Sequence, residues 1–295
     1  MGIWDDIKAS FRKGSSLTRL IYINIAVFLL LAIASIISYF INSHDFADKL
    51  VKLLAVPSSF KALLAKPWTL ITYMFTHREI LHILFNMLWL YWFGTIFLEF
   101  LDQKKLVAVY LLGGLSGAVV YIIAFNVFPV FDHMVSESIA IGASASVMAI
   151  VVSIAAYVPD YTVILFLIGR IKIKYIAIGI FILTSVLDFS VNTGGKLAHL
   201  GGALLGFFYT VNLRRGRDLG KGINNVLDYF VTLFKPRKKF RVTYKKPVTD
   251  YEYNKTKAEH QQRINEILDK ISKGGYDSLT KEEKELLFKE GQKKN

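Results

Sequence analysis

The segment Ile139–Val158 constrains the fold of this chain more than any other, because it joins the length of a membrane span to unusually small side chains. A bilayer crossing needs about 20 consecutive apolar residues. Its first turns consist almost entirely of small residues, namely Gly142, Ala143, Ser144, Ala145, Ser146 and Ala149. Small residues let helix backbones approach closely inside a membrane. The segment is therefore predicted to be the crowded centre of a membrane bundle.

The composition agrees with a membrane protein that has polar ends. Of the 295 residues, 53% are hydrophobic, and the formal net charge is +13. Long apolar runs without charges indicate several membrane crossings. The positive charge gathers after the last apolar run, which favours a membrane face near anionic lipid and no nucleic-acid partner. The chain has no cysteine, which excludes disulfides, thiolate nucleophiles and Cys-ligated zinc.

Six spans are predicted, and the fold class is an all-α membrane bundle. Residues 1–19 form a cytoplasmic segment without the features of a removable signal peptide, 20–213 the membrane domain, and 214–295 a basic linker with a small helical tail. The connection Asn42–Pro67 is too short and too charged to span, so we expect it at the membrane interface, anchored by Trp68. The spans are 20–41, 80–100, 106–125, 139–158, 176–189 and 196–213.

The distribution of Lys and Arg predicts the orientation. Basic clusters at the N-terminus, at 104–105, at 170–174 and at 214–217 fall on one side if there are six spans. The positive-inside rule then makes both termini cytoplasmic, although the lysines of 42–67 lie outside. Ser144 is placed near the external end of its span.

The tail is predicted to hold two helices. Residues 259–272 place Ile264, Ile267, Leu268 and Ile271 on one helical face, and Gly274–Gly275 ends that helix. Thr280 and Glu283 have the spacing of a capping box for a last helix. A helical pair this small buries little core. Docking on a cytoplasmic partner and a solvated tail without a partner both remain open.

Polar residues within the spans are candidates for function, because they are costly in a membrane. His82 and Asn86 are four residues apart and so project from one helix face. Two donors on one face suit a developing oxyanion, and a buried hydrogen-bonded pair between helices is the alternative. Glu99 is interpreted as structural and Asp188 as interfacial.

The sixth span carries a glycine stripe that includes a histidine. Gly195, His199, Gly202 and Gly206 fall on one face, which permits close approach of another helix. The natural partner is the small-residue helix that bears Ser144. Such a pairing brings a hydroxyl against an imidazole, as an activated serine nucleophile requires.

These motifs together resemble the rhomboid intramembrane serine proteases over about residues 68–213. The matching features are His-x-x-x-Asn in the second span, Gly-x-Ser in the fourth and Ala-His-x-x-Gly in the sixth. The resemblance implies a six-helix rhomboid-like fold, a Ser144–His199 dyad, and an oxyanion hole of His82, Asn86 and the Ser144 N–H. It also implies a substrate entrance at Phe85, a cap around 192–196 and an interfacial first loop at 45–67.

The sequence departs from the family pattern at three places. Ala145 stands where a glycine follows the serine, Met148 where an aromatic often stacks on the catalytic histidine, and Trp68–Thr69 where Trp-Arg is usual. Alanine costs about a kilocalorie or more if the backbone there has positive φ, and nothing if it is helical.

Other classes of protein fit the sequence less well. His77 and His82 are five apart with Glu79 between them, which is not the HExxH pattern of a zinc hydrolase. No internal repeat points to a transporter. The prediction is an intramembrane serine endopeptidase that cleaves transmembrane proteins near the external face, without cofactor or metal, in a bacterial inner membrane. The alternative is a rhomboid-like protein that binds membrane helices without cutting them.

Overall fold

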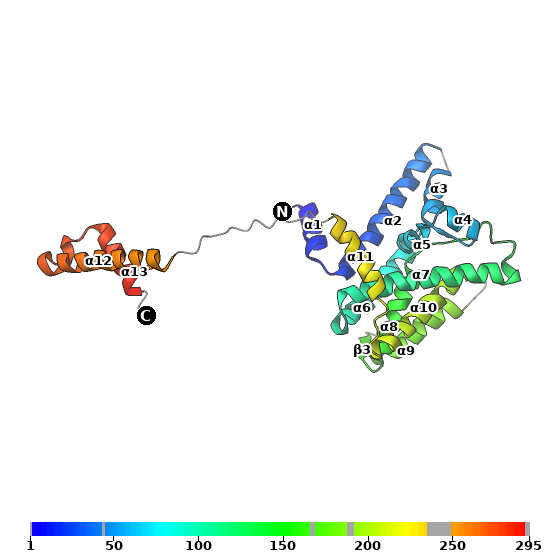
Figure 1. Ribbon diagram of the computed structural model, residues 1–295. Coiled ribbons are helices and arrows are strands. Elements are labelled where there is room, and N and C mark those ends of the chain that lie inside the picture. The colour runs from blue at the N-terminus through cyan, green and yellow to red at the C-terminus, as the bar shows by residue number, and fades with distance from the viewer. Residues whose placement is uncertain (1, 43–44, 166–168, 188–191, 235–248, 293–295) are drawn as a thin grey trace. The chain divides into compact units, whose positions relative to one another are not determined.

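The computed structural model describes residues 2–42, 45–165, 169–187, 192–234 and 249–292, and the chain forms two compact units, 1–235 and 236–295 (Figure 1). The first unit contains α1 (Ile3–Lys13), α2 (Ser16–Phe40), α3 (Asp45–Leu54), β1 (Val56–Pro57), α4 (Phe60–Ala65), α5 (Thr69–Thr72), η1 (Tyr73–Phe75), α6 (Ile80–Phe100), α7 (Gln103–Val127), η2 (Pro129–Phe131), β2 (Ile139–Ala140), α8 (Ser144–Tyr157), β3 (Thr162–Leu165), β4 (Gly169–Lys172), α9 (Ile173–Phe181), η3 (Ile182–Val186), α10 (Thr193–Arg214) and α11 (Lys221–Phe234). The second contains α12 (Asp250–Gly274), η4 (Tyr276–Ser278) and α13 (Lys281–Gln292).

The predicted all-α membrane fold is confirmed. In the described part of the chain, α2, α6 and α7 are long and apolar enough to cross a bilayer, and α8 and the α9–η3 segment are shorter apolar helices. Large apolar side chains point outward on α2 and α6, as they do on helices that face lipid, for example Leu30, Ile36, Ile80 and Leu81. The chain is thus a multi-pass membrane protein. That it has six spans remains a prediction.

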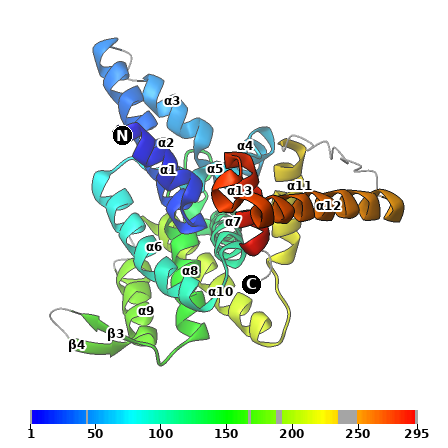
Figure 2. The same ribbon diagram turned by 90° about the vertical axis from the view of Figure 1, so that its left-hand side faces the viewer.

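Helix α8 lies at the centre of the bundle, where it packs against α6, α7, α9 and α10 (Figures 1 and 2). Ten of its residues are buried. Glycines bring α10 against it, because a Cβ at Gly202 would overlap the carbonyl oxygen of Ala145 and one at Gly206 that of Ala149. The predicted pairing of the glycine stripe with the small-residue helix is therefore confirmed.

The prediction of one continuous helix over 139–158 is wrong at its N-terminal end. Ile139 and Ala140 form β2, which pairs antiparallel with Val56 and Pro57 of β1 in the first long connection. Gly142 then adopts φ +119°, which a helix cannot contain. Helix α8 begins only at Ser144, so the turn before it sets where the serine lies.

The fifth and sixth predicted spans also differ at their ends. Helix α9 starts at Ile173 and continues as a single π-helical turn, η3, to Val186, while Asp188 lies outside the described residues. Residues 193–196, expected in a loop, form the first turn of α10, since the Asn192 side chain accepts the Gly195 N–H.

The apolar residues Val163, Ile164 and Leu165 belong to the β3–β4 hairpin, where they pair with Ile171, Arg170 and Gly169. Lys172 and Lys174 hydrogen-bond Asp160 at 2.9 and 3.0 Å. Both cations hold the pKa of the Asp160 carboxyl below its usual range. These contacts fix the hairpin to the end of α8.

The basic clusters gather at one end of the first unit. The Ser16 N–H donates to Gln103 Oε1 at 2.9 Å, which joins the start of α2 to the start of α7. Lys104 pairs with Asp228 of α11 at 2.7 Å. Arg214 at the end of α10 donates to the Tyr157 carbonyl at the end of α8. Ser144, at the other end of α8, lies away from this charged end.

The first long connection is built from short helices. Helix α3 buries Val51, and its C-terminal carbonyls accept hydrogen bonds from Trp68 Nε1 (Leu53, 2.9 Å) and Thr72 Oγ1 (Leu54, 2.7 Å). Trp68 therefore ties α3 to the segment that leads into α6.

The tail unit is a helical hairpin, as predicted, with α12 nine residues longer at its start than expected. Thr249 caps α12 with Glu252 in a capping box, a start signal that the sequence analysis missed. Thr280 and Glu283 exchange the predicted capping-box bonds. Ile267 and Leu279 are buried, whereas Leu268 is 49% exposed and does not share the buried face.

Candidate active site

One cavity of about 640 Å³ between α6, α8, η3 and α10 collects the side chains singled out by sequence. Helix α8 packs against α6 and α10 (Figure 2), and η3 packs against α10. Its lining includes Ser144, His199, His82, Asn86 and Phe85. Residues that are separated by up to 117 positions in the sequence thus face one space, with both polar and apolar walls.

Ser144 is the first residue of α8, and the helix start shapes its surroundings. The first N–H groups of a helix lack intrahelical partners and carry the positive end of its dipole. The preceding turn is fixed by two hydrogen bonds: the Gly142 N–H donates to the Tyr73 carbonyl at 2.9 Å, and the Ala143 N–H donates to His77 Nε2 at 3.3 Å. The Ser144 N–H is therefore presented where an anionic oxygen is stabilised.

His82 lies directly over Gly142. A Cβ on Gly142 would be 2.8 Å from His82 Cε1 and 3.0 Å from Nε2. The positive φ of Gly142 is also one that residues with side chains rarely adopt. Glycine is thus required both for the turn and for the place of the imidazole beside the serine.

Asn86 reaches the cavity but uses its amide inside the protein. Its Nδ2 donates to the His82 carbonyl at 2.9 Å and lies 3.4 Å from His77 Nε2. One amide hydrogen is therefore firmly bonded, and the other has a long contact.

His77 is a site residue whose role the sequence analysis missed, because it was considered only as a metal ligand. It is fully buried, and its Nε2 accepts from Ala143 and Asn86. An acceptor at Nε2 means that this imidazole is neutral, with its proton on Nδ1. His77 thus joins the turn before Ser144 to the amide of Asn86. Its place in a loop before α6 left no periodic signal by which to find it.

His199 faces the same cavity from α10, one turn before Gly202. Its Nδ1 lies 3.2 Å from Ser185 Oγ of η3. Within the described residues, no hydrogen bond joins His199 to Ser144. Catalytic hydrogen bonds are often long or poorly aligned without substrate, so the arrangement is that of a serine and an imidazole that line one cavity.

At each of the three departures from the family pattern, the structure shows what the side chain contacts or which conformation it has. Ala145 lies inside α8 in helical conformation, so it carries no φ penalty, and its Cβ faces the bare Cα of Gly117. Met148 is buried and lines the cavity with His199. Thr69 donates to the Lys66 carbonyl at 2.6 Å and so stabilises the first loop.

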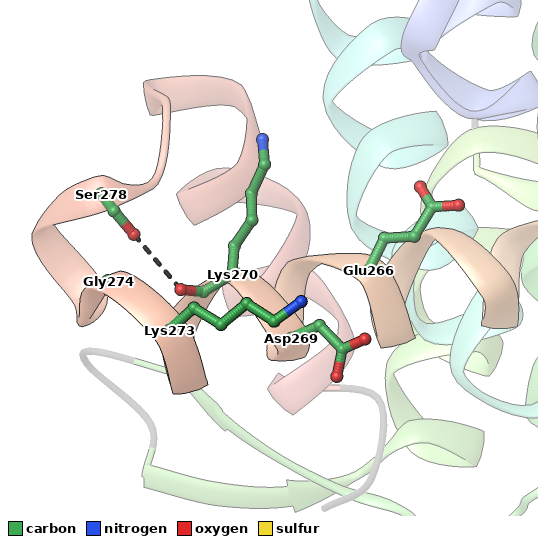
Figure 3. Close-up of a pocket in the computed structure, with 6 residues that line it drawn as sticks. All are labelled: Glu266, Asp269, Lys270, Lys273, Gly274 and Ser278. Carbon is green, nitrogen blue, oxygen red and sulfur yellow. Dashed lines mark hydrogen bonds between the residues drawn. The ribbon is translucent and has the colours of Figure 1, made fainter.

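A second hollow, of about 450 Å³, lies on the tail unit (Figure 3). Its lining is Glu266, Asp269, Lys270, Lys273, Gly274 and Ser278. The Ser278 hydroxyl is used on the backbone carbonyl of Gly275 at 2.6 Å. Exposed charges of both signs around a bonded hydroxyl offer no activated nucleophile, so the membrane cavity is the candidate site.

Comparison with known proteins gives three matches. Residues 64–216 match the Rhomboid domain model, and residues 249–290 match DUF6576, a family of unknown function. The chain is 32% identical over 161 residues to the protein named "RHOMBOID-like protein 12, mitochondrial" of Arabidopsis thaliana. The alignment covers 50% of this chain and 47% of that relative, so the chain spans about half the length of the curated relative it matches.

Proposed function

The chain belongs to the rhomboid family, and on that premise we propose that it is an intramembrane serine endopeptidase with Ser144 as nucleophile and His199 as base. The observation that carries the proposal is the shared cavity, which is lined by a serine at a helix start, the imidazole of His199 and two further side chains with N–H donors. Together these are the parts that acyl transfer to a serine needs.

The proposed reaction has two halves. Ser144 Oγ attacks the scissile carbonyl while His199 Nε2 takes the hydroxyl proton. His199 then gives that proton to the leaving amine as the C–N bond breaks, and an acyl-enzyme remains. Water then attacks the acyl carbon while His199 takes a proton from it, and His199 returns that proton to Ser144 Oγ as the ester bond breaks and the new acid leaves.

The oxyanion would be held by the Ser144 N–H, His82 and Asn86. His82 rests on Gly142 next to the serine. Asn86 keeps its 2.9 Å bond to the His82 carbonyl and exchanges its 3.4 Å contact with His77 for the oxyanion. Replacing so long a contact costs little.

The substrates would be transmembrane proteins cut near the external face. The basic clusters lie at the end of the bundle away from Ser144, and the positive-inside rule makes that end, with both termini, cytoplasmic. Phe85, 52% exposed on α6 and at the wall of the cavity, would mark the substrate entrance. A bacterial inner membrane is proposed as the location.

The alternative is a rhomboid-like protein that binds membrane helices without cleavage. Two observations favour it: no hydrogen bond between Ser144 and His199 occurs in the described structure, and the amide of Asn86 is engaged within the protein. This alternative predicts binding that survives loss of the serine and is never followed by a cut.

Cleavage of a single-span reporter protein in proteoliposomes separates the two functions. The protease predicts a product with the wild type and none with Ser144→Ala or His199→Ala, while all three proteins stay folded and inserted. A wild type that binds the reporter but leaves it intact, or a Ser144→Ala variant that cuts it at the wild-type rate, would refute the proposal.

A further inference from the structure

A run of hydroxyl groups leads from the backbone of α9 to the imidazole of His199. Thr184 Oγ1 donates to the Ile180 carbonyl at 2.8 Å. Thr184 Oγ1 and Ser185 Oγ are 3.3 Å apart, and Ser185 Oγ is 3.2 Å from His199 Nδ1. Thr184 and Ser185 belong to the π-helical turn η3, a distortion often found at functional sites.

The bond from Thr184 Oγ1 to the Ile180 carbonyl limits which group in this run can donate to which. A hydroxyl has one proton to donate, and Thr184 donates its proton to a carbonyl that can only accept. Thr184 Oγ1 can therefore only accept from Ser185. With the Ser185 proton directed to Thr184, the Ser185 oxygen accepts from His199, and the imidazole carries a proton on Nδ1.

The partner of His199 Nδ1 is thus an acceptor, the Ser185 oxygen. Nε2, for which the described residues provide no hydrogen-bond partner, is left with its lone pair.

We propose that Ser185 is a positioning residue, which holds His199 in the Nδ1–H tautomer so that Nε2 is the base for Ser144. The inference rests on the proposed protease function. In serine proteases with a triad, a carboxylate fixes the tautomer and orientation of the histidine. Here a neutral hydroxyl, itself directed by Thr184, performs that task from a neighbouring helix.

The position of Ser185 suits such a task. Ser185 is only 5% exposed, so water competes little for its hydrogen bond to His199. Thr184 also lines the cavity, and the π-turn brings two consecutive hydroxyls toward α10. The hydrogen bond will strengthen when His199 takes the proton of Ser144, because bonds to a charged partner are stronger than neutral ones.

The first test is kinetic, in the full-length protein with the reporter substrate. Ser185→Ala should lower kcat about 10- to 100-fold, the range expected for a hydrogen bond to a charged group, with KM within about twofold. Ser185→Thr, which keeps the hydroxyl, should restore most of kcat. Thr184→Val, which leaves the proton of Ser185 undirected, should also lower kcat.

A matched control removes a different hydroxyl bond to α10. Ser116 Oγ donates to the Gly201 carbonyl at 2.9 Å, two residues after His199 and outside the cavity lining. Ser116→Ala should keep kcat within about twofold. If Ser116→Ala lowers kcat as much as Ser185→Ala, or if Ser185→Thr fails to restore it, the positioning role is refuted and Ser185 is a packing residue.

The second test reads the tautomer and needs no turnover. In ¹⁵N-histidine-labelled protein, NMR shifts of His199, assigned by comparison with His199→Gln, should show Nδ1–H in the wild type. Ser185→Ala and Thr184→Val should show a mixture of tautomers. A wild type with Nε2–H, or an unchanged spectrum in Ser185→Ala, would overturn the proposal.

The two tests keep the two proposals distinguishable. A protein that cleaves nothing yet shows the expected tautomer and its loss in Ser185→Ala would refute the protease function and support the assigned hydrogen bond. A protein that cleaves normally in the Ser185→Ala form would support the protease and refute the positioning role.

Discussion

Gly202 of α10 lies against the carbonyl oxygen of Ala145 in α8, so closely that a Cβ on Gly202 would overlap that oxygen. Because Ala145 follows Ser144 and Gly202 follows His199 by less than one turn, this contact sets the separation of the two proposed catalytic helices. The backbone of α8 cannot move aside cheaply, since its neighbours on α7 are also in close contact.

Gly202→Ala should therefore destabilise the membrane domain by about 1–3 kcal/mol, the usual cost of overpacking a core, and lower cleavage. Thermal unfolding in detergent measures the first effect and the reporter assay the second. Gly179→Ala is the control, because a Cβ there meets no other atom within 4 Å. Equal stability of the two variants would contradict close packing of α8 and α10.

Gly142→Ala should impair the site more than the fold. The positive φ at this position destabilises a residue with a side chain by about 1–3 kcal/mol. The new Cβ would also displace His82, because His82 Cε1 would be 2.8 Å from it. Gly169→Ala introduces similar backbone strain at φ +84°, but its new Cβ meets no atom within 4 Å. Both variants should unfold at lower temperature than the wild type, and only Gly142→Ala should lose at least about tenfold in kcat. Equal kcat in the two variants would show that His82 has no part in the reaction.

Asn86→Ala tests the oxyanion assignment. Loss of one donor to the transition state should lower kcat by about 10²–10³ and change KM little, because the bond forms only in the transition state. Asn126→Ala is the matched control, since Asn126 makes the same bond to a carbonyl four residues earlier, at 2.8 Å to Ile122. A drop in kcat of similar size for both variants would mean that Asn86 acts through the fold alone.

Glu283 links the two helices of the tail through its charge. The hydrogen bonds from Lys270 Nζ, at 2.6 Å, and from the Thr280 N–H hold the pKa of the Glu283 carboxyl below its usual range. A lowered folded pKa means that this stabilisation is complete above the unfolded pKa and is lost as the pH falls through the folded one. Glu283→Gln keeps a capping side chain and removes the charge.

Amide exchange in α13 should thus become about two- to fivefold faster at pH 7 in Glu283→Gln, a modest change because the pair is exposed. The full-length protein is suitable for this measurement by mass spectrometry. Glu285→Gln, on the exposed side of the same helix, should leave exchange unchanged. If both variants exchange alike, the Lys270–Glu283 pair contributes nothing to the tail.

Sequence patterns predicted the elements whose cause is local. The spacing of Gly202 and Gly206 fixed which face of α10 meets α8, and the Thr280–Glu283 pair fixed where α13 begins. The family was also evident from three short motifs. Each of these depends on residues a few positions apart, so a single sequence contains the whole signal.

Features that depend on distant partners were missed. The strand β2 pairs with Val56 and Pro57, more than 80 positions earlier, and its apolar residues look like part of the helix that follows. His77 and Ser185 acquire their roles only from the atoms brought beside them, Ala143 N–H and His199 Nδ1. A hydroxyl in an apolar helix has no pattern that distinguishes packing from positioning.

The most direct test of the central claim is covalent labelling of the folded protein with a fluorophosphonate probe, which reacts with activated serines. The wild type should be labelled, Ser144→Ala should not, and His199→Ala should lose nearly all labelling because the serine lacks its base. Folding is checked by thermal unfolding of all three proteins in the same detergent. Labelling that is absent from a folded wild type, or that persists in Ser144→Ala, would contradict an activated serine at position 144.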